Sequence, residues 1–121
     1  MPDERDLVRL RHMHDAASKA IKFCEGLSRE DLDKQEILSL ALVHLLEIVG
    51  EAAKGTSEKT KARAAGIPWK AIAGTRDRLA HRYFEVDLDI VWEIIRSDLP
   101  PVIAALKMIL DEAAKEDSGT K

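Results

Sequence analysis

Apolar residues recur at helical spacing along most of the chain. In the first segment, residues 3–25, successive apolar-face positions alternate between intervals of three and four residues: Leu7, Leu10, His14, Ala17, Ile21 and Cys24. Such a narrow stripe is typical of a helix that packs nearly antiparallel to its neighbours in a bundle. Gly26 is predicted to end this helix. Ser28 followed by Asp31 has the spacing of a capping box, which predicts a new helix start.

The second predicted helix carries the strongest apolar signal. In "EILSLALVHLLEIVGEAA", residues 36–53, apolar side chains cover nearly the whole circumference. A helix of this kind is either central in its domain or buries a second face against another chain. In a domain of 121 residues the second option is open, so the pattern hints at a dimer.

A polar segment, residues 54–66, reads as a loop with a short helical turn. Pro68 then suits the first turn of a third helix, which is predicted to extend through Arg76 towards His81. The inward face of this helix would be formed by Trp69, Ile72, Ala73 and Leu79.

The C-terminal third is predicted to hold two further helices. Residues 84–89 connect to the first of them, residues 90–99, with Asp87 or Asp89 as its N-cap. The pair Pro100–Pro101 is expected to break or kink the path. A last helix, residues 101–115, would direct a further apolar set inward: Val102, Leu106, Ile109 and Ala113.

No segment alternates convincingly enough to predict a strand. The expected fold class is therefore all-α, an up-and-down bundle of four to five helices. The length fits one core, so we expect a single domain, residues 1–116, with a frayed polar tail, residues 117–121. Only 4% of residues are aromatic and 34% are charged, which is ordinary for a globular helical chain.

The cysteine content and the N-terminus bear on location. Cys24 is the only cysteine, so the chain has no internal disulfide and no cysteine cluster for zinc, which favours a reducing, cytoplasmic setting. The N-terminus is charged from its third residue, and we expect no signal peptide. No apolar run approaches the ~20 residues needed to span a bilayer, so no membrane association is expected.

Charge is distributed unevenly along the chain. The whole sequence carries −3, but residues 54–82 hold eight basic and two acidic side chains. That segment is therefore +6 and the remainder −9. A local basic surface on an acidic body attracts polyanions at distances of roughly 8–10 Å.

The basic segment ends in "RDRLAHRYF", residues 76–84, where His81 lies close to three arginines. Neighbouring positive charge disfavours the imidazolium form, which keeps a histidine neutral and able to act as a general base. Such a base could take the proton of a ribose 2′-OH while the planar guanidinium of an arginine binds the phosphorane that forms. The alternative is a solvated cationic helix end without chemistry.

Spacing restricts how this site can form. Arg76 and His81 are five residues apart, or about 140° on a regular helix, so they do not share one face. Either the helix ends before His81, or two chains pool their residues across a dimer.

Other candidate residues favour structural roles. His12 and His14 lie about 200° apart on a helix and cannot share a metal ion. We expect His14 and His44 to be partly buried and hydrogen-bonded. Glu47 and Glu51, one turn apart, could act as acid and base, but ion pairing at a surface or interface is favoured. No metal site and no cofactor are predicted.

The motif "RDRLAHRYF" resembles the R-x4-H-x-Y pattern of HEPN domains, in particular the HepT-like toxins of prokaryotic toxin–antitoxin pairs. The resemblance extends over residues 46–54, 67–95 and 98–100. It implies an all-α HEPN bundle that forms a homodimer and cleaves RNA without metal in a cleft between the two chains. It further implies Arg76 as phosphate binder and transition-state stabiliser and His81 as general acid/base.

The resemblance also assigns supporting roles. Asp77 takes the polar position after the arginine, and Tyr83 takes that of the motif tyrosine, to which a nucleotidyltransferase (MNT) antitoxin adds AMP in related systems. We expect three further cations to bind RNA phosphates: Lys70, Arg78 and Arg82. Two residues depart from the family pattern, because Asp77 stands where Asn is common and Arg82 where Gly is common.

Two functions from different classes follow. The first is a toxin of a type II-like or type VII-like toxin–antitoxin system, a metal-independent ribonuclease neutralised by its nucleotidyltransferase. The second is a non-catalytic helical binding module that docks such a nucleotidyltransferase. A stand-alone structural bundle is a third option, against which the +6 segment argues.

Overall fold

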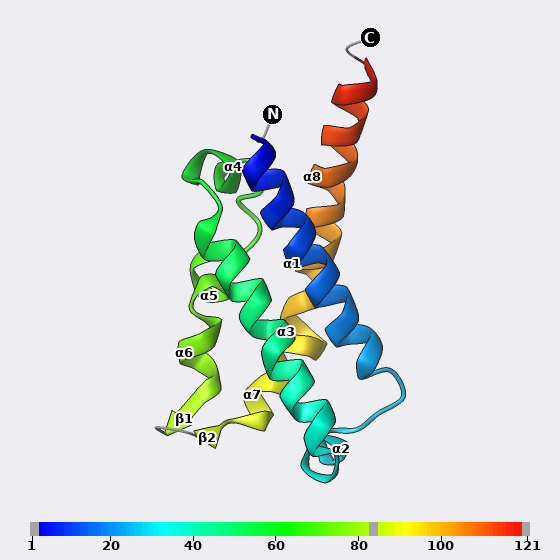
Figure 1. Ribbon diagram of the computed structural model, residues 1–121, viewed down its shortest axis with the longest axis vertical. Helices are drawn as coiled ribbons and strands as arrows, with labels where there is room; N and C mark the ends of the chain where they lie inside the picture. The colour runs from blue at the N-terminus through cyan, green and yellow to red at the C-terminus, as the bar shows by residue number, and fades with distance from the viewer. Residues whose placement is uncertain (1–2, 83–84, 120–121) are drawn as a thin grey trace.

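Three long helices form the frame of the fold (Figure 1): α1 (Glu4–Phe23), α3 (Glu36–Gly55) and α8 (Leu99–Gly119). The computed structural model describes residues 3–82 and 85–119. α1 packs against α3 along one side and α8 along the other, and α3 in turn packs against α5 (Trp69–Ala73). The predicted all-α class is confirmed.

Shorter elements connect the long helices. Two brief strands, absent from the expectation, form an antiparallel hairpin that pairs Ala80 with Val86. The other elements are α2 (Arg29–Lys34), α4 (Glu58–Ala62), α6 (Thr75–Leu79), β1 (Ala80–Arg82), β2 (Glu85–Val86), α7 (Leu88–Glu93) and the π-helical turn η1 (Ile94–Asp98).

The predicted core faces are largely confirmed. In α8 the whole predicted inward set is buried, as are Trp69, Ile72 and Leu79 before it. In α1 the stripe is rotated slightly, because Met13 is fully buried whereas His14 is only partly so. Residue spacing alone does not fix this rotation, because the apolar residues of α1 form more than one stripe that could face the core.

Local start signals are also confirmed. Ser28 and Asp31 form the capping box that begins α2. The Asp87 carboxylate accepts hydrogen bonds from the backbone amides of Asp89 and Ile90 and so caps α7.

The expected break at the proline pair is absent. α7, η1 and α8 follow one another without a loop, and the amide of Leu99 bonds to the carbonyl of Ile94 five residues earlier. Pro100 and Pro101 provide no N–H for carbonyls of the preceding turn. A π-helical turn directly before them lets the chain continue as α8.

A buried carboxylate joins the start of α1 to α4. Asp6 is 2% exposed and accepts hydrogen bonds from the Ser57 hydroxyl at 2.5 Å and the Thr60 hydroxyl at 2.6 Å. Burial alone would raise the pKa of Asp6, but these hydrogen bonds, the Ser57 amide and the charge of Arg9 outweigh it and lower the pKa.

The helix α3 has two different sides. Leu42, Leu46 and Val49 are buried in the core, whereas Ile37 is 85% and Leu40 64% exposed. His44 is exposed as well, so its predicted partial burial is wrong. An apolar pattern around the whole circumference does not reveal which face turns inward, and the packing of α1 and α5 decides it.

Candidate functional site

The motif arginine lies on a helix shorter than expected. The predicted third helix is divided at Gly74 into α5 and α6. Thr75 follows this break, and its hydroxyl donates to the Ile72 carbonyl at 2.5 Å, which competes with regular helix bonding. α6 is anchored by the buried Thr75 and Leu79, so Arg76 points away from the core and is 76% exposed.

The helix ends before the motif histidine. The carbonyl of Leu79 accepts the amide of Asp87 at 2.8 Å, and the chain enters β1 at Ala80. The backbone of His81 is therefore extended, and the 140° offset of a regular helix does not apply. This matches the first of the two expected routes. The side chains of His81 and Arg82, and all of Tyr83, lie outside the described residues.

Arg76 faces an acidic residue of α3. Its Nε lies 3.8 Å from Oε2 of Glu47, which confirms Glu47 as an ion-pair partner. The helices come close here because Gly50 has no side chain: a Cβ at this position would lie 3.2 Å from the Ile72 carbonyl oxygen. A carboxylate beside Arg76 holds the guanidinium at the edge of α3 and partly compensates its charge.

Arg78 is directed to a different part of the fold. Its Nη1 lies 3.2 Å from Oδ2 of Asp98 at the end of η1, and both side chains are about one-third exposed. Asp98 was not among the site residues expected from the sequence. The two residues are 20 positions apart, and no local spacing signals their contact.

Other cations of the basic segment also have carboxylate neighbours. Arg63 lies 3.9 Å from Glu112 and 3.7 Å from Glu116, and Lys61 lies 3.5 Å from Glu58. Lys70 is exposed on α5, and among the described side chains no carboxylate lies within 4.0 Å of it. The +6 segment is therefore not one uncompensated patch. Near the motif, Arg76 and Lys70 are the basic residues of this segment whose described side chains are exposed.

Asp77 stays exposed on α6, next to Arg76 in sequence. The described carboxylate partner of Arg78 is Asp98, so Arg78 is held by a residue other than Asp77. Among the side chains that the structure describes, which leave out those of residues 80–85 and 117–121, no group of three or more His, Cys, Asp or Glu is placed to hold a metal ion. No helix within residues 3–82 and 85–119 is long and apolar enough to cross a bilayer.

Comparison with known proteins gives a consistent result. The sequence model of one family, described as "Ribonuclease HepT-like", matches residues 13–109. "Putative RNase TTE0752" of Caldanaerobacter subterraneus subsp. tengcongensis is 38% identical over 103 residues, which cover 85% of this chain and 92% of that protein.

Two archaeal proteins are similar over most of their length. "Probable ribonuclease HepT" of Thermococcus cleftensis is 34% identical over 69% of this chain and 79% of its own. "Putative RNase MJ1216" of Methanocaldococcus jannaschii is 30% identical over 83% of each chain. No solved structure matches this chain.

Proposed function

The chain belongs to the HepT-like ribonuclease family of the HEPN superfamily, and from this premise we propose that it is an endoribonuclease acting without a metal ion. The observation that carries the proposal is the placement of the motif. Arg76 projects into solvent from α6, and the helix ends at Leu79, which frees His81 from the helical offset.

The proposed reaction is transesterification of the RNA backbone. His81 takes the proton from a ribose 2′-OH, and the 2′ oxygen attacks the adjacent phosphorus. The bond from phosphorus to the 5′ oxygen breaks, that oxygen receives a proton, and a 2′,3′-cyclic phosphate remains. The Arg76 guanidinium binds the phosphate oxygens as negative charge accumulates on them.

The surrounding cations have different proposed parts. Lys70 on α5 and Arg82 next to His81 attract RNA phosphates. Arg78, which pairs with Asp98, contributes by holding α6 in place more than by direct contact. Two chains are proposed to form one composite site as a homodimer.

Regulation is proposed to involve Tyr83. A nucleotidyltransferase encoded as the cognate antitoxin would add AMP to its hydroxyl and place a bulky anion beside Arg76 and His81. RNA phosphate would then be excluded by volume and by charge. In this proposal the protein is the toxin of a toxin–antitoxin pair, and RNA and the antitoxin are its partners.

A cleavage assay tests the reaction. Purified protein should degrade RNA in EDTA and leave 2′,3′-cyclic phosphate ends, and Arg76→Ala or His81→Ala should abolish both cleavage and growth arrest. Arg63→Ala is the matched control, because Arg63 is paired with Glu112 and Glu116 on α8. An active His81→Ala protein would contradict the catalytic assignment.

One observation favours a second candidate, a non-catalytic module that docks a nucleotidyltransferase. Glu47 lies 3.8 Å from Arg76 and competes with phosphate for the guanidinium. This candidate predicts a stable complex with the nucleotidyltransferase but no RNA cleavage. A gain of one or more AMP units in the intact mass after co-expression, mapped to Tyr83 by peptide analysis, would identify the modification. The RNA assay separates the two functions.

A further inference from the structure

A hollow of about 540 Å³ lies between α4 and α5, outside the motif. We call it the α4–α5 hollow. Its lining residues belong to these two short helices: Glu58, Lys61, Ala62, Trp69, Lys70 and Ala73. Sites that bind one small molecule have volumes of roughly 300–1,000 Å³, so the α4–α5 hollow is large enough for a single nucleotide.

Buried groups hold both walls of the α4–α5 hollow in place. On the α4 side, the buried carboxylate of Asp6 accepts hydrogen bonds from the hydroxyls of Ser57 and Thr60. On the α5 side, the ring of Trp69 is buried, and its indole N–H donates to the Ala64 carbonyl at 3.0 Å. The hollow is therefore already formed before anything binds, which lowers the free-energy cost of binding.

Two lysines give the α4–α5 hollow positive charge. Lys70 is exposed, and among the described side chains it has no carboxylate partner. The side chain of Lys61 is largely buried along its aliphatic part, and its ammonium group lies 3.5 Å from Glu58. Glu58 is 93% exposed, and an ion pair with so exposed a carboxylate is weak. A phosphate group can therefore replace Glu58 beside Lys61 at little cost in free energy.

The α4–α5 hollow lies on the same edge of the molecule as the motif. Figure 1 shows α4, α5, α6 and β1 in succession along this edge. Helical hydrogen bonds cross the break at Gly74, because its amide donates to Lys70 and its carbonyl accepts from Arg78. Ala73 comes three residues before Arg76, and Lys70 comes six before it, or about 9 Å along a helix axis. A strand bound at Arg76 that follows α5 thus reaches Lys70 and the hollow.

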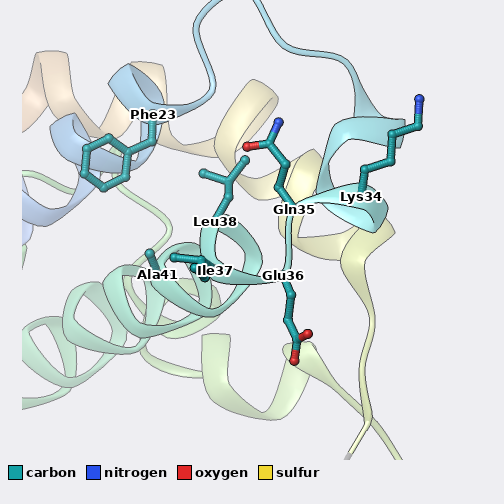
Figure 2. Close-up of a pocket in the computed structure, with 7 residues that line it drawn as sticks. All are labelled: Phe23, Lys34, Gln35, Glu36, Ile37, Leu38 and Ala41. Carbon is teal, nitrogen blue, oxygen red and sulfur yellow. The ribbon is translucent and has the colours of Figure 1, made fainter.

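A larger hollow beside the start of α3 differs in its surroundings (Figure 2). Phe23, Leu38 and Ala41 lie on one side of it and Lys34 on the other. It is formed by the end of α1, the end of α2 and the start of α3, whereas the α4–α5 hollow follows the end of α3. Lys34 is exposed like Lys70 but lies outside the succession from α4 to β1, so it offers a matched control.

We propose that the α4–α5 hollow is a subsite for a nucleotide of the RNA strand that is cleaved, a few positions away from the cleaved linkage. This inference rests on the proposed function, in which Arg76 binds the phosphate at that linkage. Lys61 and Lys70 bind the phosphate of the subsite nucleotide, and the apolar surface of Trp69 and Ala73 contacts its sugar or base. Such contacts bind single-stranded RNA with little regard to sequence. The subsite favours RNA that extends beyond the cleaved linkage on one side.

Oligonucleotides with one cleavable position test the subsite. A 2′-O-methyl RNA with a single ribonucleotide fixes the cleaved linkage, and it is extended one nucleotide at a time on either side. For the wild type, KM should fall by about tenfold once extension on one side reaches the hollow, because a further phosphate is then bound. Ala62→Glu places a carboxylate in the hollow and should abolish this gain, whereas Ala62→Lys should enlarge it.

The controls separate the hollow from general effects. Ala62 is exposed, so both replacements are compatible with the fold, and equal Tm values should confirm this. Lys34→Ala removes an exposed lysine from the hollow shown in Figure 2 and should retain the full gain in KM. A wild type whose KM does not depend on length, or a gain that Ala62→Glu retains, overturns the proposal.

Failure of the proposed function is scored separately. If no oligonucleotide is cleaved, the ribonuclease assignment fails. Binding of fully 2′-O-methylated RNA still tests the subsite in that case, since it requires no reaction. Its Kd should show the same dependence on length and the same response to Ala62→Glu and Ala62→Lys. A Kd that ignores both replacements overturns the subsite.

Discussion

The guanidinium of Arg78 lies 3.2 Å from the carboxylate of Asp98. This ion pair joins α6, the helix that carries Arg76, to the π-helical turn η1 that precedes α8. Arg76 projects from the same short helix. A five-residue helix has little stability by itself. Its orientation therefore depends on tertiary contacts such as this pair and the burial of Thr75 and Leu79.

The first prediction concerns this pair. Arg78→Ala and Asp98→Ala should each lower the free energy of unfolding, and a double-mutant cycle should give a coupling of about 1 kcal/mol, since both groups are partly exposed. Urea unfolding measures it. The pair Lys107–Asp111 on α8 is the control, because both of its side chains are about two-thirds exposed and its coupling should be smaller.

The same variants separate two roles of Arg78. If Arg78 acts by holding α6, Asp98→Ala should reduce RNA cleavage as much as Arg78→Ala, and the double variant should be no worse. An Asp98→Ala protein with full activity beside an impaired Arg78→Ala protein would instead indicate direct phosphate contact by Arg78.

The second prediction concerns pH. The pKa of Asp6 is lowered in the folded protein, so its ionised form stabilises the fold at pH values above the ordinary aspartate pKa of 3.8. That contribution is lost as the pH falls from 3.8 through the lowered value. Asp6→Asn should cost about 2–3 kcal/mol at pH 7, because Ser57 and Thr60 lose a charged acceptor.

Urea unfolding from pH 7 to pH 3 gives the free energy of unfolding of the wild type and of Asp6→Asn. The difference between these two free energies should become smaller at the acid end. Asp111→Asn, at an exposed position of α8, should show little difference at any pH. A difference that stayed constant down to pH 3 would contradict the role assigned to the Asp6 charge.

The third prediction concerns the contact between α3 and α5. Alanine in place of a helical glycine usually stabilises a helix by up to about 1 kcal/mol. At Gly50 the new Cβ would lie 3.2 Å from the Ile72 carbonyl oxygen, which is backbone and cannot move aside alone. Gly50→Ala should therefore destabilise the protein and, by displacing α5 and α6, reduce RNA cleavage.

Gly55→Ala is its matched control. There the new Cβ would meet only the end of the Arg9 side chain, at 2.8 Å, which can rotate away. Thermal unfolding should show a lower Tm for Gly50→Ala and an unchanged or slightly higher Tm for Gly55→Ala. The reverse order of Tm values would show that α3 and α5 can move apart without loss of stability.

The fourth prediction concerns RNA binding. Arg76 and Lys70 are accessible, whereas Arg63 is engaged by Glu112 and Glu116. Binding of 2′-O-methyl RNA, which lacks the nucleophile, should weaken with salt. A plot of the logarithm of the association constant against the logarithm of the salt concentration has a negative slope. The magnitude of this slope should decrease by about 0.7 in Arg76→Ala or Lys70→Ala. Arg63→Ala should leave the slope unchanged, and equal losses in all three would favour a diffuse basic surface.

Much of this fold could be predicted because its signals are local. The capping box of Ser28 and Asp31 and the cap at Asp87 involve groups no more than three residues apart, so the sequence specifies them directly. The buried face of α8 could be predicted from the helical spacing of apolar residues within that one segment. The motif that marks the family is likewise a short run of adjacent residues.

Contacts between distant segments required the tertiary structure. Sequence alone did not show that α3 turns Ile37 and His44 outward, because its apolar residues surround the helix and only its neighbours select a face. It did not pair Arg78 with Asp98, which are 20 residues apart. The end of α6 depends on a hydrogen bond from Asp87 to Leu79, so the extended backbone at His81 is a product of chain reversal, which residue spacing does not encode.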